Sequence, residues 1–258
     1  MPHRTSLAIR TLGPYGGSAP GYRLTSFLVD GESAIDAGAL TDALSLSAQR
    51  RIKRVILTHA HFDHIASLPL LIENLYGQSH ALEIFAPEPV LAVISRDLLN
   101  DRIWPDFRVL PSKARPTVRL RPISENKPFR AGRVVFTPFA VSHVVPAYGY
   151  IVSRPGRSVL FSGDTEPTDK LWAAAARARD LKAIFLELSF SDAQIEVARA
   201  SRHLTPGLVL AEMLKAPPRV PIYLYHMKPP SLARIRREIA AAREPRLKLL
   251  DGERSFRF

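Results

Sequence analysis

Residues 53–64 read KRVILTHAHFDH, an apolar run followed at once by three histidines and an aspartate. The β-branched run predicts a buried strand over 53–58, and the apolar spacing after it predicts a helix over 65–77. In an extended segment, residues two apart point the same way, so His59 and His61 can converge on one point. This stretch therefore places clustered polar side chains where a strand ends and a helix begins.

The residue types in this cluster are those of a metal site. Asp63 and His64 lie where the chain turns into the helix, and they can be aimed at a second point beside His59 and His61. Neutral imidazole and carboxylate are suitable ligands for zinc and also for manganese or iron. A polar turn with incidental histidines is the alternative interpretation. The spacing favours the metal site.

Four residues cannot fill two metal sites, so further ligands are expected beyond other strands. Three candidates follow the predicted strands 133–140, 158–162 and 220–225, and they are His143, Asp164 and His226. The carboxyl ends of strands are where α/β proteins commonly place their chemistry. Taken singly, each residue also fits a structural histidine or a turn-forming aspartate. Their shared position favours ligation.

Composition limits the chemistry and the surroundings of the protein. The 258 residues include no cysteine, which excludes disulfides, thiolate metal sites and cysteine nucleophiles. No apolar run reaches the roughly 18 residues of a membrane span, and the first residues do not resemble a signal peptide, so we expect a cytoplasmic protein. A net charge of +12 suggests an anionic partner such as a nucleotide, a nucleic acid or an acidic surface. The densest basic cluster, which is either a solvated face or an anion-steering patch, is Arg50, Arg51, Lys53 and Arg54.

The chain alternates between strand and helix patterns, which predicts one α/β domain over residues 1–258. Five prolines within 102–131 predict edge strands and turns there. Besides the strands already given, we expect strands at 22–29, 33–35, 82–86, 147–153, 182–188 and 246–250. The expected further helices cover 40–50, 88–101, 167–179, 206–215 and 231–243.

The HxHxDH motif, together with the later His143, Asp164 and His226, resembles the five-motif pattern of the metallo-β-lactamase superfamily, with Asp36 in AIDAG as its first motif. The resemblance covers about residues 6–251 and implies a four-layer αβ/βα sandwich built on two facing sheets. Several segments resemble one branch more closely, that of class II 3′,5′-cyclic-nucleotide phosphodiesterases. These segments are THAHFDHIASLPLLIENLYG, PFAVSHVVPAYGYIV, FSGDTEPTDKLW, AIFLELSF and SRHLTP.

This resemblance implies two divalent metal ions, most simply Zn²⁺, with Mn²⁺ or Fe²⁺ as alternatives. By motif position, one ion would be held by His59, His61 and His143, the other by Asp63, His64 and His226, with Asp164 bridging both. Asp36 would orient a ligand or a water molecule, unless it only forms a turn. The implied reaction hydrolyses cyclic AMP or cyclic GMP to the 5′-monophosphate through a hydroxide shared by the ions. Asp63, Asp164 and His203 would be the catalytic residues, with His203 either supplying a proton or contacting the phosphate.

Other functions remain open at this stage. The same core occurs in tRNA 3′-end endonucleases, in other nucleic-acid phosphodiesterases and in thioester hydrolases. The non-enzyme alternative is a nucleic-acid-binding protein on a metal-stabilised scaffold. We expect a small anionic phosphodiester as substrate and no association with a membrane. Nucleic acid is an alternative partner, and a homodimer is an alternative to the monomer. His3 and His80 are interpreted as surface residues. The aromatic residues that either stack on a base or belong to the core are Phe62, Tyr76, Tyr148 and Tyr150.

Overall fold

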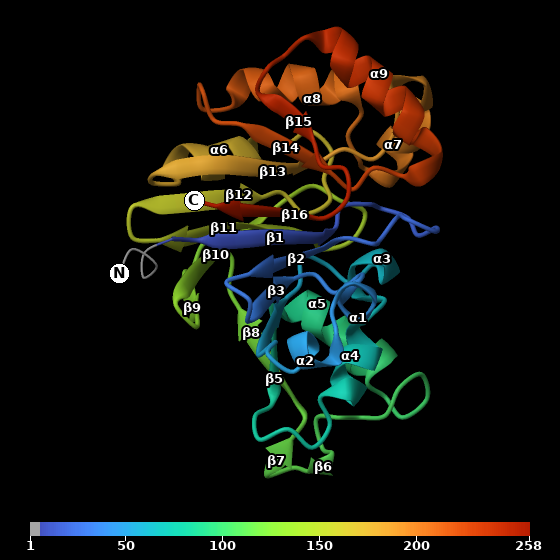
Figure 1. Cartoon of the computed structure of the whole chain (residues 1–258), viewed down its shortest axis with the longest axis vertical. Coiled ribbons are helices and arrows are strands. Elements are labelled where there is room, and N and C mark those ends of the chain that lie inside the picture. The colour runs from blue at the N-terminus through green and yellow to red at the C-terminus, as the bar shows by residue number, and fades with distance from the viewer. Residues whose placement is uncertain (1–5) are drawn as a thin grey trace.

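The computed structural model describes residues 6–258, and in it two seven-stranded sheets face each other (Figure 1). The first sheet has the order β16 (Arg254–Arg257), β1 (Ala8–Gly13), β2 (Ser26–Val29), β3 (Ser33–Ile35), β4 (Arg54–Ile56), β5 (Leu82–Pro87) and β8 (Val118–Ile123). The second has the order β15 (Leu247–Leu249), β14 (Ile222–Tyr225), β13 (Leu181–Glu187), β12 (Arg157–Phe161), β11 (Tyr148–Arg154), β10 (Val134–Ala140) and β9 (Phe129–Ala131).

An aromatic layer fills the space between the sheets. Phe27 of the first sheet meets Phe161 of the second edge-to-face, with ring centroids 4.9 Å apart. Phe161 in turn stacks on Phe185 at 4.5 Å, and all three side chains are buried. Rings in such geometries add to the free energy gained by burying their apolar surface. This layer holds the two sheets in one fixed relation.

Helices cover the outer faces of both sheets (Figure 1). Against the first sheet lie α1 (Leu40–Ala43), α2 (Leu46–Gln49), α3 (Phe62–Ile65), α4 (Leu68–Asn74) and α5 (Glu88–Val93), the last continuing as a π-helical turn over Ile94–Leu98. Against the second lie α6 (Asp169–Arg177), α7 (Ile195–Ser201), α8 (Pro206–Glu212) and α9 (Leu232–Ala242). The expected four-layer αβ/βα sandwich is therefore confirmed. The division into one domain stays a prediction.

The structure corrects several expected boundaries. The helix expected over 40–50 is two short helices, because the Ser45 hydroxyl caps a new start by accepting from the Ala48 amide. The helix expected over 65–77 begins earlier and is interrupted near Ser67, whose hydroxyl instead bonds the backbone of Ala37 and Leu40. The helix expected over 88–101 ends as the π-helical turn, and the strand expected from residue 22 starts at Ser26.

Three elements were not expected at all, namely β1, α7 and β16. The prolines within 102–131, by contrast, have the predicted consequence. This stretch supplies β8 and β9, the edge strands of the two sheets, and a small hairpin of β6 (Pro111–Ser112) and β7 (Arg115–Pro116). In residues 6–258, no helix has the length and apolar character needed to cross a bilayer.

Candidate metal centre

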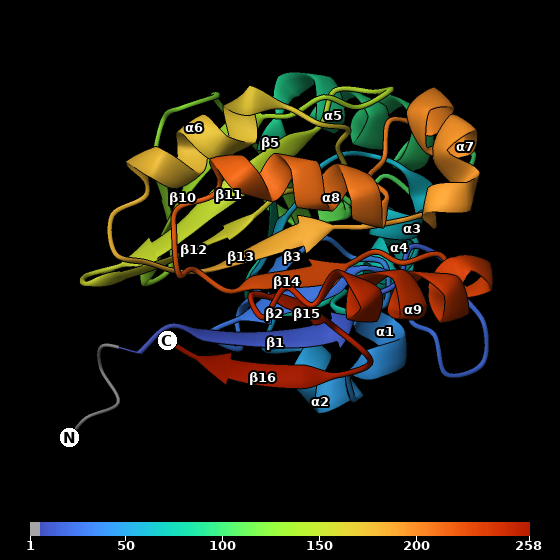
Figure 2. The same cartoon turned by 90° about the horizontal axis from the view of Figure 1, so that it is seen from above.

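The predicted ligands meet at one end of the sandwich, beyond the carboxyl ends of several strands. His59, His61, Asp63 and His64 follow β4 and enter α3. His143, Asp164 and His226 follow β10, β12 and β14 in the other sheet. Figure 2 shows α3 and α7 at the end of the molecule away from the C-terminus. All seven predicted ligands are thus brought to the same end by both sheets.

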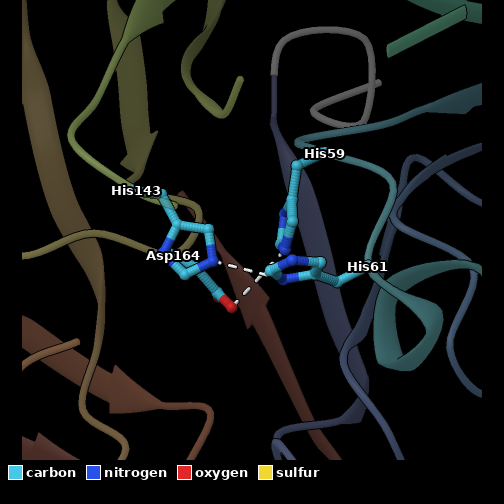
Figure 3. Close-up of side chains that lie close together, drawn as sticks. All are labelled: His59, His61, His143 and Asp164. Atoms are coloured by element: carbon cyan, nitrogen blue, oxygen red, sulfur yellow. Dashed lines mark hydrogen bonds and ion pairs between the residues drawn. The ribbon is translucent and has the colours of Figure 1, made fainter. Parts of the chain in front are cut away.

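The ligand atoms form two groups. In the first, one atom each of His59, His61, His143 and Asp164 lie within 4.8 Å of one another (Figure 3). In the second, Asp63, His64 and His226 do the same. Asp164 joins the two groups, because its Oδ2 lies 3.6 Å from His59 Nε2 and 3.3 Å from His64 Nε2.

The separations between these atoms match those of ligands around a small cation. His61 Nδ1 lies 3.2 Å from His143 Nε2, and His64 Nε2 lies 3.0 Å from His226 Nε2. Ligands about 2.0–2.1 Å from a tetrahedral zinc ion are about 3.3 Å from each other. In addition, His59 Nε2 and Asp164 Oδ1 are buried without a hydrogen-bond partner. The residues therefore fit divalent metal ions.

In His59 and His64, the ring nitrogen that points away from the centre forms a hydrogen bond, and this bond orients the ring. His59 Nδ1 lies 3.0 Å from Thr58 Oγ1, and His64 Nδ1 lies 2.7 Å from Asp36 Oδ2. Thr58 also donates its hydroxyl and its amide to Asp36, so Asp36 supports both rings. A ligating histidine commonly binds such an acceptor through its second nitrogen, which fixes the tautomer and the ring. The structure thus supports the orienting role expected for Asp36. Its φ of 57° shows that it also turns the chain.

The second sheet supports its histidines in the same manner. His143 Nδ1 donates to the backbone oxygen of Arg202 at 3.1 Å. His226 Nδ1 lies 2.9 Å from Ser189 Oγ, which donates to Glu187 Oε2 at 3.0 Å. Gly16 packs against His226, and a Cβ at this glycine would lie only 2.6 Å from the imidazole ring. Position 16 therefore has no room for a side chain.

His203 lies beside the ligand groups. Its Nδ1 donates to Glu187 Oε1 at 2.9 Å, and its ring stacks on that of His226 with centroids 5.5 Å apart. Burial lowers the pKa of His203, but the negative charge and hydrogen bond of Glu187 outweigh this and raise it above the ordinary value. This position and charge suit a proton donor next to the two ligand groups.

The charges of the centre are strongly perturbed. Burial would raise the pKa of Asp164, but the positive charges of neighbouring histidines, His226 first, hold it well below its ordinary range. Burial lowers the pKa of His59, and it lowers the pKa of His143 and of His226 to about 4. His64 is the exception, because the charges of neighbouring carboxylates, Asp164 first, outweigh burial and raise its pKa well above the ordinary value. Ionised carboxylates and neutral imidazoles are the protonation states that bind metal, so His64 would lose a proton on metal binding.

Glu187, Ser189 and Lys228 also contact the centre, and no role was expected for them from the sequence. Lys228 Nζ donates to Asp63 Oδ2 at 3.1 Å and to the backbone oxygen of Gly16. Glu187 and Ser189 stand at the end of an apolar strand, and this interruption was the available signal. Lys228 had none, because its contacts join segments that are far apart in the sequence.

Two predictions about other residues have mixed outcomes. His80 is half-buried rather than a surface residue, and its Nε2 is enclosed without a partner. His3 lies outside the described residues. Among the aromatic candidates, Tyr150 is buried and donates to the Leu57 backbone oxygen, so it belongs to the core. Phe62, at the start of α3, is 73% exposed.

We expect the metal-free protein to lose stability as the pH falls from about 6.5 to about 4. In this window the unfolded chain binds protons on His143 and His226 that the folded chain excludes, so the free energy of unfolding decreases. His143→Gln should reduce that loss by up to about 3 kcal/mol. Urea unfolding in the presence of a chelator measures this, and an equal loss in both proteins would contradict it.

Comparison with known proteins places this centre in a wider group. Ribonuclease Z of Pyrococcus abyssi is 33% identical over 117 residues, which cover 43% of this chain and 34% of that protein. The chain thus aligns with about a third of the length of this curated relative. Among solved structures, the metallo-beta-lactamase fold protein YhfI from Bacillus subtilis has a TM-score of 0.78 at 17% identity and covers 99% of this chain and 100% of its own. Unliganded yeast PDE1 has a TM-score of 0.79 at 19% identity, with coverage of 97% and 99%.

These two structural likenesses show the fold. The family follows from the sequence, because the profile described as "Beta-lactamase superfamily domain" matches residues 34–227, which include all seven predicted ligands. The chain therefore belongs to the beta-lactamase superfamily domain family, and its His and Asp cluster is able to bind metal ions.

Proposed function

We propose that this protein is a metal-dependent phosphodiesterase that opens 3′,5′-cyclic nucleotides to 5′-monophosphates. The observation that carries the proposal is the pair of ligand groups joined by Asp164, with the His203–Glu187 pair beside them. Two divalent ions held there would activate a water molecule and neutralise negative charge on the phosphate. The likeness of the motif segments to class II cyclic-nucleotide phosphodiesterases supports the choice of substrate.

Asp164, Asp63 and His203 have different roles in the proposed reaction. Asp164 contacts both groups, so it would help to hold both ions. Asp63 is held toward the second group by Lys228 and lies 3.2 Å from His226 Nε2. Burial lowers the pKa of His203, but Glu187 outweighs burial and raises it, which favours the protonated ring. His203 is the group we propose to supply a proton to the departing 3′-oxygen of the ribose.

Two exposed apolar side chains adjoin the predicted ligands along the chain. Phe62 lies between the ligands His61 and Asp63, and Val144 follows His143 directly. Their exposed fractions are 73% and 49%, high for large apolar side chains. A purine can stack on an exposed phenyl ring, so Phe62 is the base contact we propose.

Cleavage of RNA is the second candidate. It is favoured by the identity of about one third to Ribonuclease Z over 117 residues. The tRNA 3′-end endonucleases that this chain resembles usually grip their substrate with a long Gly- and Pro-rich arm. Against RNA cleavage, residues 102–131 of the described chain form only a short hairpin and two edge strands. Parallel assays of cyclic AMP and a precursor tRNA with Zn²⁺ or Mn²⁺ separate the two, and a preference for the tRNA would overturn the proposal.

Asp164→Ala should lower the turnover of cyclic AMP by several orders of magnitude, because the carboxylate joining the two groups is lost. Asp169→Ala is the matched control, since Asp169 is exposed and pairs only with Lys215. Circular dichroism checks that both variants are folded. Normal hydrolysis by folded Asp164→Ala would show that the assigned bridge is wrong.

His203→Ala should lower kcat for cyclic AMP by roughly 10²- to 10⁴-fold, the usual contribution of a general acid. A p-nitrophenyl phosphodiester has a leaving group that needs no proton, so its turnover should fall much less. Steady-state kinetics with both substrates measure the difference. Full kcat for cyclic AMP, or equal losses on both substrates, would remove His203 from proton transfer.

Phe62→Ala should raise KM for cyclic AMP roughly tenfold and leave kcat nearly unchanged, since base stacking contributes about 1–3 kcal/mol. Phe62→Trp should retain the wild-type KM. Tyr76→Ala is the control, because Tyr76 is also an exposed aromatic residue but follows α4, away from the ligands. An unchanged KM in Phe62→Ala would refute the stacking.

A further inference from the structure

Much of the positive charge of the protein lies on one stretch of the chain. Residues 113–133 contain seven Lys and Arg side chains and a single acidic one, Glu125, which accounts for half of the net charge of the chain. All seven are exposed, and they are Lys113, Arg115, Arg119, Arg121, Lys127, Arg130 and Arg133. They come from β7, β8, β9 and the adjoining turns.

Two hollows are lined in part by three of these residues. The hollows adjoin each other, because Arg54 lines both. The larger, of about 600 Å³, is also lined by Arg133, Arg154 and Arg257. The smaller, of about 390 Å³, is also lined by Lys53, Arg115 and Arg119. We call the surface formed by both hollows, together with Arg121, the basic face.

The acidic groups of the basic face are already paired. Asp30 lies 2.9 Å from Arg154, Glu32 lies 3.1 Å from Lys53, and Glu83 lies 2.8 Å from Arg121. Within residues 6–258, Arg115, Arg119 and Arg133 form no ion pair with a carboxylate. Arg154 is only 7% exposed, and its Nε has no hydrogen-bond partner in this part of the chain. The basic face therefore keeps unneutralised guanidinium groups.

The basic face and the metal centre lie at opposite ends of the same strands. Arg54 begins β4 and His59 follows its carboxyl end, which places them roughly 16 Å apart at about 3.3 Å per residue. Figure 1 shows β8 and β9 on the side of the molecule away from α3 and α7. A small substrate at the metal centre does not reach these guanidinium groups.

We infer that the basic face is a second, non-catalytic binding site for a nucleic-acid strand. Arginine binds phosphate through two parallel hydrogen bonds, and unpaired arginines in adjoining hollows suit consecutive phosphates of one backbone. A membrane surface fits less well, because none of the large exposed apolar side chains of the described chain lies in 113–133 or lines either hollow. The inference goes beyond the proposed function and does not depend on turnover.

The test is fluorescence anisotropy of a labelled single-stranded RNA oligonucleotide, with metal removed by chelator and salt varied. Wild-type protein should bind, with an affinity that falls steeply as salt increases. Arg115→Glu/Arg133→Glu changes one guanidinium in each hollow. It should weaken binding on the order of tenfold or more and reduce the salt slope by about 1 for each lost phosphate contact.

Arg234→Glu/Arg237→Glu is the matched control, because these α9 residues are exposed and the charge change is identical. It should bind RNA as the wild type does. An equal loss in both variants, absence of binding at low salt, or binding to phosphatidylserine vesicles in place of RNA would each overturn the inference. Both variants should keep the wild-type kcat/KM for cyclic AMP. If the wild type has no such turnover, the proposed function fails while the binding result stands.

Discussion

The structure depends on one constraint, the close approach of imidazole ring nitrogens that are carried by different sheets. His64 Nε2 and His226 Nε2 are 3.0 Å apart, and His61 Nδ1 and His143 Nε2 are 3.2 Å apart. A proton can lie between His64 and His226 in the metal-free protein, because the charges of Asp164 and Asp36 outweigh burial and raise the pKa of His64 well above its ordinary value. A metal ion in that place would be bound by both nitrogens. The fold maintains this approach because Asp36, Thr58, Ser189 and the Arg202 carbonyl hold the opposite sides of the rings.

The two sheets contribute different parts of this arrangement. The first sheet supplies a contiguous motif at the end of β4, and the second supplies one ligand from each of three strand ends. The aromatic layer from Phe27 to Phe185 fixes the sheets against each other, so the two halves of the centre meet at a constant separation. The packing of the two sheets therefore also determines the distances between the predicted ligands. A core change that shifts one sheet would also separate the ligands.

Much of this could be predicted from the sequence, for physical reasons. A motif such as HAHFDH carries its spacing within one strand–helix turn, and apolar runs mark the strands that carry His143, Asp164 and His226. Supporting residues were harder to predict, because Lys228 reaches Asp63 across 165 positions of the chain. Two strands at one edge of the first sheet, β1 and the four-residue β16, were not predicted. They pair with each other across almost the whole length of the chain, and β1 also pairs with β2. The basic face was predicted only in part. Lys53 and Arg54 belong to the basic cluster seen in the sequence, but Arg54 and Arg133 meet only through the packing of two sheets.

The central claim is that seven side chains, carried by strands of both sheets, hold two metal ions. Anomalous diffraction at the zinc edge, from crystals grown with Zn²⁺, tests it most directly. The account predicts two peaks about 3.5–4 Å apart. One would lie among His59, His61 and His143, the other among Asp63, His64 and His226, with Asp164 between them. A single peak, or none within these groups in zinc-saturated crystals, would contradict it.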